Sequence, residues 1–510
     1  MNRLIAIGVL AALIAVPLAM RTAPALGSQT LVIITPHGEP IRAEFGRAFS
    51  AWYQREHGVS IVVDWRTPGG TSDIRRFLDG AYRNALLDSD HSLSAGIDGF
   101  NNPKLADDAP DALKAARAAF LASNVGTGID LFFGGGEFPY RQMAGQGYLM
   151  DAGLLTSEPT WFTDAVIPQS MSGETVYDSK GRYYGACLAV FGIAWSPDRL
   201  RDLGLPAPQQ WRDLTDPSYF RQLTIADPTK SGAVVTTLER MLQQRMAEAA
   251  NGDLASGWAD GWLMIKTLVA NSRWVTDSAS KPTRDTARGD CLASTAIDFQ
   301  AKLEQEHARH ESGGAERLSF IVPVGGTSVS ADPIALLRGA PHRDLAIDFI
   351  HFVLSSEGQR LWNYRVGTPG GPTRWCLRRL PVRRDVLDAE WKQYAGDPDT
   401  DPFALAQTFT YRPAWTSAAY PLIGPLTKAM ALDVRDELQH AWKAIIAAGG
   451  PSRVPEAWAE FSWLPVAYTD ISANVTALSK PLTAVPRLRE WTTEAQRRYR
   501  HASELAEAGR

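Results

Sequence analysis

The chain has 510 residues, of which 45% are hydrophobic and 21% are charged, and its formal net charge is −4. This is the composition of an ordinary globular protein, so it excludes wholesale disorder, collagen-like repeats and a multi-span membrane protein. More than one lobe is expected, because single cores stop growing near roughly 250–300 residues. The mild acidity offers no basic face for nucleic acid, and the three scattered cysteines predict no disulfide framework and no zinc site.

Residues 1–27 have the pattern of a secretory signal. One positive charge, Arg3, precedes an uncharged run from Leu4 to Met20, and small residues follow. A charged start, an apolar middle and a small-residue end are typical of signal peptides. The run is slightly shorter than the roughly 20 residues of a spanning helix, so an uncleaved N-terminal anchor is the alternative. In either case we expect the remaining chain to be exported to the periplasm.

The chain from residue 30 to 180 alternates apolar strands with amphipathic helices. This rhythm predicts a parallel sheet with helices on its faces and ligand loops at the carboxyl ends of its strands. Residues 84–128 interrupt the rhythm with dense Asp, Ser, Asn, Gly and Pro, and we interpret them as an insertion on the surface or over the mouth of a cleft. The expected elements are strands at 31–35, 60–65 and 128–133, a helix at 41–57 and a second helix after the glycine-rich turn at 67–72.

A second lobe is predicted over residues 181–319, and residues 320–380 are expected to return to the first lobe. The second lobe opens with an apolar stretch at 183–195 that is typical of one fully buried strand. Residues 381–510 predict a helical C-terminal region that packs on the lobes. The further expected elements are strands at 223–226 and 319–324 and helices at 234–250, 341–362 and 487–508.

Several segments resemble one family, the extracytoplasmic solute-binding proteins of ABC importers, and most closely its ferric-iron-binding type. The strongest match is ADPTKSGAVVTTLERMLQQ at Ala226–Gln244, a strand followed by a Pro-Thr-x-Ser-Gly turn and a helix. A second match covers Pro323–Trp362 and includes the SSEGQ text near the end of a helix. The DWRTPGGTSDIRRFL and IDLFFGGG segments also look like the family's first lobe. The resemblance covers roughly residues 30–365 without the insertion.

The resemblance implies an α/β, two-lobed periplasmic-binding-protein fold of type II, with hinge strands and here a helical C-terminal extension. It also implies a carrier, not an enzyme: a monomer that captures a small molecule or metal between its lobes and delivers it to an ABC permease. Hinge closure stabilised by ligand contacts from both lobes is the physical basis of such capture. A bound cofactor is not required, although ferric iron is a candidate for the transported ligand.

Two predicted metal ligands lie at the ends of first-lobe strands. His37 follows the first strand, where open α/β sheets place their ligands, and it matches a metal-ligating histidine of the ferric-binding relatives. Glu137 follows the Gly134–Gly136 turn, where the family's ligating glutamate falls. A surface histidine and a solvated loop carboxylate are the alternative interpretations of these two residues.

Two helix starts are predicted anion sites. Ser231, Gly232 and Ala233 open a helix, and a hydroxyl with unpaired backbone N–H groups binds an anion without a basic residue. In the family this turn holds a synergistic phosphate or carbonate, or an anionic group of the ligand. Simple N-capping by Ser231 is the alternative. Thr71 and Ser72 could form a comparable site in the first lobe.

The sequence departs from the family at the iron pocket. Ferric-binding relatives supply two adjacent tyrosines, and Phe299 and Gln300 stand at that place here, beside Asp298. His37, Glu137 and Asp298 could hold ferric iron or a divalent metal without those tyrosines. They could instead bind an ammonium group while the Ser231 turn binds phosphate or phosphonate. A polyamine or a thiamine-like ligand is a further alternative.

A secreted hydrolase and a membrane-tethered sensor are the two other function classes. A secreted hydrolase is disfavoured, because the sequence has no G-x-S-x-G elbow and no H-E-x-x-H helix. A membrane-tethered ligand sensor remains the alternative if the N-terminal segment is an uncleaved anchor.

Overall fold

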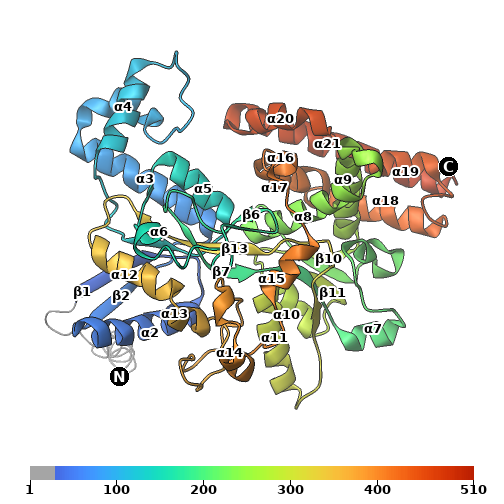
Figure 1. Ribbon diagram of the computed structural model, residues 1–510. Helices are drawn as coiled ribbons and strands as arrows, with labels where there is room; N and C mark the ends of the chain where they lie inside the picture. The colour runs from blue at the N-terminus through green and yellow to red at the C-terminus, as the bar shows by residue number, and fades with distance from the viewer. Residues whose placement is uncertain (1–28) are drawn as a thin grey trace, which may run out of the picture.

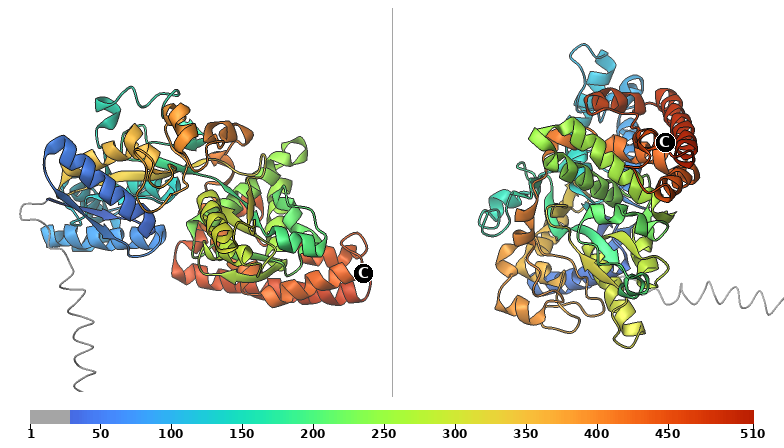
Figure 2. Two further views of the ribbon diagram at one scale, coloured as in Figure 1. Left: turned by 90° about the horizontal axis from the view of Figure 1, so that it is seen from below. Right: turned by 90° about the vertical axis from the view of Figure 1, so that its right-hand side faces the viewer.

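The computed structural model describes residues 29–510, and the expected signal peptide or anchor at 1–27 lies outside them. The described chain forms two α/β lobes, each built around its own sheet (Figures 1 and 2). The two-lobed α/β fold expected from the sequence is therefore confirmed. None of the described helices is both long and apolar enough to cross a bilayer.

The first sheet has the strand order β2-β1-β3-β13-β4, and β7 also pairs with β13. β1, β2 and β3 run parallel, while β13 is antiparallel to its neighbours β3, β4 and β7. Apolar residues such as Leu31 and Ile33 are fully buried, because helices cover both faces of the sheet. The strands are β1 (Gln29–Ile34), β2 (Ile61–Arg66), β3 (Leu131–Phe133), β4 (Leu149–Met150), β7 (Tyr184–Ala189) and β13 (Ser330–Leu337).

Helices of the first lobe begin where parallel strands end. The aromatic face of α2 packs Phe45 and Phe49 against Trp362 and Phe352, which gives this lobe an aromatic core. The helix predicted at 341–362 is broken at Ser355, whose hydroxyl accepts a hydrogen bond from the Gly358 amide at 3.2 Å. The helices are α2 (Glu39–His57), α3 (Thr71–Ser89), α5 (Glu137–Gln146), α6 (Leu154–Ser157), α12 (Arg343–Leu354) and α13 (Ser356–Leu361).

The insertion at 84–128 forms a compact surface unit on α3. It contains a 3-10 segment, His91–Gly99, and the helix α4 (Asp111–Ala122), and it rises above the first lobe in Figure 1. Its buried rings, Phe100 and Phe120, pack against Tyr82 and Tyr148 of the lobe. The insertion therefore extends the hydrophobic cluster on one face of the first sheet, which explains why the strand–helix rhythm pauses here.

The single strand predicted over 183–195 is wrong. The stretch forms two strands that belong to different sheets, β7 in the first and β8 (Phe191–Trp195) in the second, with Val190 between them. The residues up to Ala194 are buried because the chain passes directly from one lobe's core to the other, so hydrophobicity alone does not reveal the break. The crossing back is made between β12 (Ser319–Ile321), which pairs with β8, and β13.

The second sheet has the order β10-β9-β11-β8-β12. Its core contains the fully buried rings of Trp211, Trp258 and Trp262. α8 and α9 pack side by side on this sheet, and Gly257 and Gly261 of α9 allow the two helices to approach closely. The remaining elements are β9 (Leu223–Ala226), β10 (Ser272–Thr276), β11 (Ala293–Ile297), α7 (Pro197–Leu203), α8 (Gly232–Glu248), α9 (Leu254–Ala270), α10 (Lys281–Ala287) and α11 (Asp298–Glu311).

The C-terminal region divides between the two lobes. Residues 381–406 contribute Val382 and Phe403 to the first-lobe core, whereas the helices after residue 413 pack on the second lobe and extend its core. The long helix α21 lies along the outside of the second lobe (Figure 2). The helices are α14 (Ala389–Tyr394), α15 (Pro402–Leu405), α16 (Pro413–Thr416), α17 (Tyr420–Thr427), a π-helical turn (Lys428–Leu432), α18 (Arg435–Ala447), α19 (Pro455–Ser462), α20 (Ile471–Leu478) and α21 (Pro481–Glu507).

A buried lysine joins this C-terminal region to α9. The Nζ atom of Lys266 donates hydrogen bonds to the carbonyl oxygens of Phe461 at 2.7 Å and Trp463 at 2.6 Å. None of the described carboxylates forms an ion pair with it, and Arg498 adds like-charge repulsion. Burial lowers the pKa of Lys266 from 10.5 to about 7. The folded state therefore favours the neutral amine.

This burial predicts that the chain is more stable at alkaline pH. The unfolded state binds more protons than the folded state between pH 7 and 10.5, so the free energy of unfolding rises with pH in that window. In chemical denaturation, we expect the free energy of unfolding of wild type to rise from pH 7 to pH 9.5 by about 2–3 kcal/mol more than that of Lys266→Met. Lys443→Met, on an exposed lysine of α18, should show no such difference. A parallel pH response of wild type and Lys266→Met would contradict the assignment.

Candidate ligand-binding site

The carboxyl ends of β1 and β3 and the start of α3 meet in the first lobe around Gly134–Gly136. Gly134 and Gly135 have φ angles of 98° and 104°, a backbone conformation that favours glycine. A Cβ atom on Gly134 would lie 2.5 Å from the His37 ring, and one on Gly135 would lie 2.6 Å from Thr71 Oγ1. The glycine turn therefore lets His37 and Thr71 lie directly against the backbone. Ser72, the next residue of α3, is exposed.

Glu137 starts α5 beside this turn. Its Oε1 accepts a hydrogen bond from the hydroxyl of Tyr183 at 2.8 Å, and Arg141 lies 3.8 Å away. Burial raises the pKa of Glu137 in spite of both groups. The carboxyl group is thus held by its own lobe, in an environment that favours its protonated form.

The start of α8 is open in the second lobe. Ser231 is the N-cap residue, yet its side chain makes no capping hydrogen bond, and the first turn contains no acidic residue. The first backbone N–H groups of a helix have no partner within the helix, so Gly232 and Ala233 present donors and a positive dipole end. In contrast, the Asp73 carboxylate accepts a hydrogen bond from Gly70 at the start of α3, which disfavours an anion beside Thr71 and Ser72.

Tyr420 links the starts of α5 and α8 across the lobes. Its ring stacks on Phe138 of α5 with the centroids 4.3 Å apart, and its hydroxyl donates to the Gly232 carbonyl oxygen at 3.2 Å. The same hydroxyl lies 3.2 Å from Thr236 Oγ1. The two helix starts therefore lie on the two sides of one tyrosine, at the boundary between the lobes.

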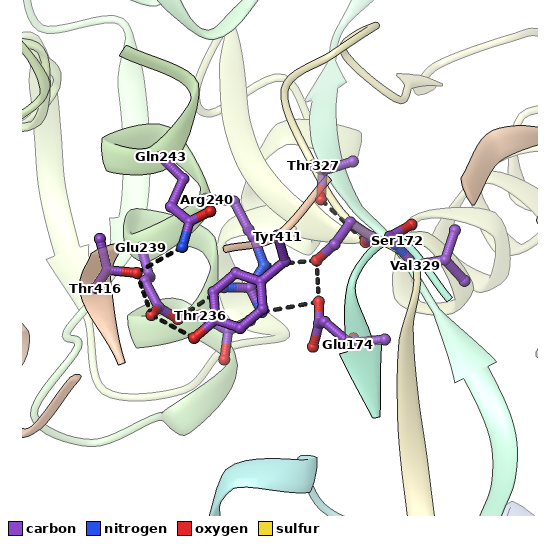
Figure 3. Close-up of polar contacts among 12 residues, drawn as sticks. Ser172, Glu174, Thr236, Glu239, Arg240, Gln243, Thr327, Val329, Tyr411 and Thr416 are labelled. Carbon is purple, nitrogen blue, oxygen red and sulfur yellow. Dashed lines mark hydrogen bonds and ion pairs between the residues drawn. The ribbon is translucent and has the colours of Figure 1, made fainter. Parts of the chain in front are cut away.

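A buried ion network ties α8 to the chain that joins the lobes (Figure 3). The Arg240 guanidinium pairs with Glu239 at 2.7 Å and with Glu174 at 2.8 Å, and its Nε donates to Ser328 Oγ at 2.5 Å. Tyr411 stacks on the guanidinium at 4.1 Å and donates its hydroxyl to Glu239 at 2.9 Å. Burial alone would lower the pKa of Arg240, but the two carboxylates outweigh it and raise the pKa.

Asp298 lies at the start of α11 and is fully buried. Neither of its carboxylate oxygens has a hydrogen-bond partner among the described residues. Burial raises its pKa from 3.8 to about 6, against the favourable charges of Lys302 and Arg379. At neutral pH the fold therefore bears the cost of an ionised carboxylate with poor local compensation.

The structure does not bring His37, Glu137 and Asp298 together as a metal centre. The described residues contain no group of three or more His, Cys, Asp and Glu side chains placed to hold one metal ion. His37 packs on Phe133 and lies 3.6 Å from Asp332, whereas Glu137 bonds to Tyr183. The three described cysteines are free thiols.

Sequence reasoning missed the charged residues that organise this region. Asp332 stands in an otherwise apolar strand, and Arg240 stands in a helix that is buried on nearly every side. A charge inside an apolar segment signals a buried ion pair, and that signal was available in both segments. Tyr420 carries no comparable signal, because its role depends on the packing of a distant C-terminal helix.

Residues 139–397, just over half of the chain, match the family of bacterial extracellular solute-binding proteins. The chain therefore belongs to this family, and the predicted resemblance is confirmed. Solute-binding proteins of this kind bind small ligands and work with ABC permeases, and the chain has their two-lobed type II fold.

Two curated relatives are similar over part of their length. The chain is 28% identical over 234 residues to an uncharacterized protein of Haemophilus influenzae, covering 46% of this chain and 60% of that protein. It is 26% identical over 208 residues to the phosphoglycerate transport regulatory protein PgtC of Salmonella typhimurium, covering 41% and 45%. The chain thus spans about half the length of these relatives.

Solved structures with a similar arrangement include binding proteins of different ligands. AfuA from Actinobacillus pleuropneumoniae with bound fructose-6-phosphate matches at 22% identity and a TM-score of 0.44, covering 66% of this chain and 82% of that chain. Iron-bound HitA from Pseudomonas aeruginosa matches at 16% identity and a TM-score of 0.45, covering 76% and 94%.

The ion network predicts a large loss of stability for Arg240→Gln. Removing one partner leaves Glu174 and Glu239 buried without their cation, which typically costs about 3–5 kcal/mol. Arg245→Gln on the same helix removes an arginine whose partners, Glu248 and Asp260, are partly exposed, so its loss should stay below about 1 kcal/mol. Urea denaturation of both variants measures the difference, and equal losses would contradict a special role of Arg240.

Asp298 predicts a pH-dependent gain of stability on neutralisation. Because the folded-state pKa is raised, the folded state holds more protons than the unfolded state between pH 3.8 and about 6, and wild-type stability falls across that window. The advantage of Asp298→Asn over wild type should grow by up to about 3 kcal/mol from pH 4 to pH 7. Asp108→Asn, at an exposed aspartate, is the control and should show a constant difference at both pH values.

Proposed function

We propose that this chain is the periplasmic binding component of an ABC importer and that its ligand is a small phosphorylated organic compound. The phosphate binds the Ser231–Ala233 start of α8, and the lobes close over the rest of the molecule. Ferric iron with a synergistic anion is the competing ligand class.

The observation that carries this proposal is the unused start of α8. The first turns of α5 and α11 each carry an acidic residue, Glu137 and Asp298, whereas the first turn of α8 has none and its N-cap hydroxyl makes no capping bond. Backbone donors and a helix dipole suit the charge of a phosphate. The partial similarity to PgtC, a phosphoglycerate transport regulatory protein by name, supports the same ligand class.

Calorimetric titration of refolded, ligand-free protein tests the proposal. We expect 3-phosphoglycerate or glycerol 3-phosphate to bind with a one-to-one stoichiometry, without turnover. Binding of ferric citrate alone, or binding of neither phosphate compound, would overturn the phosphate assignment.

A single substitution tests the position of the phosphate. Ser231→Asp retains an N-cap that stabilises the helix but places a negative charge in the anion site, so affinity for the phosphate compounds should fall at least roughly tenfold. Ser355→Asp makes the same change at the start of α13 and should leave affinity unchanged. Equal affinity of wild type and Ser231→Asp would place the phosphate elsewhere.

A further inference from the structure

A second group of polar side chains near the hinge leaves part of its hydrogen-bonding capacity unused. His37, at 7% exposure, has both ring nitrogens buried without a hydrogen-bond partner, and the buried Nε atoms of Arg42 and Arg379 have none either. Buried polar groups are almost always hydrogen-bonded. Three neighbouring side chains with free donors therefore indicate a polar ligand group.

The chain places these donors together from three separate segments. His37 follows β1, Arg42 lies on the first turns of α2, and Arg379 precedes Leu380, whose carbonyl oxygen accepts the Leu188 amide of β7 at 2.7 Å. The charges of Arg42 and Arg379 both act on His37. We name His37, Arg42 and Arg379 the hinge donor group.

Arg379 also lies against a residue of the segment that, by resemblance, corresponds to the iron pocket. Its guanidinium stacks on Phe299 at 4.3 Å, the residue that stands where ferric-binding relatives supply a tyrosine. It forms an ion pair with Asp332, whose other neighbour is His37 at 3.6 Å. A permanent cation thus sits beside the histidine that would otherwise ligate a metal, and it repels a metal ion.

The charge balance of the group favours an anion. Asp332 is already paired with Arg379, and the Asp298 carboxylate adds a second negative charge that acts on Arg379. Arg42 forms no ion pair with any described carboxylate. The Arg42 guanidinium is therefore left without a carboxylate partner, and a planar guanidinium fork suits a carboxylate ligand.

We propose that the hinge donor group binds a carboxylate of the ligand and that Arg379 makes the site select an organic acid over a metal ion. The inference rests on the proposed function: with phosphate at the start of α8, it defines the ligand class as a phosphorylated carboxylic acid. It assigns a role to Arg379 and Arg42 that is independent of the phosphate site.

Calorimetry with pairs of ligands that differ only in a carboxylate measures the hinge donor group separately from the phosphate site. 3-Phosphoglycerate and glycerol 3-phosphate differ by a carboxylate, as do glycerate and glycerol. For wild type we expect the carboxylate member of each pair to bind at least roughly tenfold more tightly. Arg379→Gln should remove this preference while leaving the affinity for glycerol 3-phosphate unchanged.

Two further variants exclude a merely structural effect. Asp332→Asn releases Arg379 from its ion pair and should increase carboxylate affinity several-fold, opposite in sign to Arg379→Gln. Arg383→Gln removes another buried arginine, which pairs with Asp385 away from the cluster, and should change neither affinity. Loss of binding in both Asp332→Asn and Arg379→Gln would overturn the inference.

The outcomes distinguish this inference from the phosphate proposal. Carboxylate binding that depends on Arg379 but not on phosphate upholds the hinge donor group and refutes the phosphate site. Binding of 3-phosphoglycerate and glycerol 3-phosphate with equal affinity refutes the hinge donor group and upholds the phosphate site. Absence of carboxylate binding by wild type overturns the inference whatever the phosphate result.

Discussion

The buried guanidinium of Arg240 is the constraint on which the geometry of the cleft depends. A desolvated cation is tolerated only with close compensating groups, and its partners come from two parts of the chain: Glu239 from α8 itself and Glu174 from a hairpin beside β13. Arg240 lies eight residues after Gly232, about 12 Å along a rigid helix. Fixing Arg240 to the joining segments therefore fixes the direction in which the open start of α8 points.

The second lobe carries two buried ionisable groups whose pKa values are shifted in opposite directions. Burial of Asp298 makes the folded state less stable above acid pH, and burial of Lys266 makes it less stable below alkaline pH. Both residues therefore reduce the free energy of unfolding at neutral pH. The lobe tolerates them because its core is large and aromatic and because the C-terminal helices extend it. Backbone carbonyl groups of the C-terminal region accept hydrogen bonds from the Lys266 amine, so this region also stabilises a buried polar group of the lobe.

The sequence predicted the two-lobed fold and most of its elements, because strand–helix alternation and amphipathic spacing are local signals. It placed the open helix start at Ser231 correctly, since a Ser-Gly turn before a helix is also local. It failed at 183–195, where two strands of different sheets are equally buried. The three predicted metal ligands are not brought together in the described residues, where Asp332 lies beside His37 and pairs with Arg379. These contacts come from long-range pairing and carry no local signal in the sequence.

Two contacts between the lobes, the Arg240 network and the Phe138–Tyr420 stack, differ in kind. The Arg240 network pairs α8 with Glu174 of a first-lobe hairpin and with Ser328 of a joining segment, whereas the Phe138–Tyr420 stack is a single aromatic contact between the two helix starts. An aromatic pair contributes about 0.5–1.5 kcal/mol beyond its buried area, which shifts a two-state equilibrium roughly 2- to 13-fold. That bias is too small to close the protein fully, because a shift from 1:99 to 99:1 requires about 5.5 kcal/mol. The ligand must supply the remaining free energy of closure through contacts with both lobes. The closed form is therefore populated only when a ligand is bound, and the affinity of the lobes for each other is not sufficient.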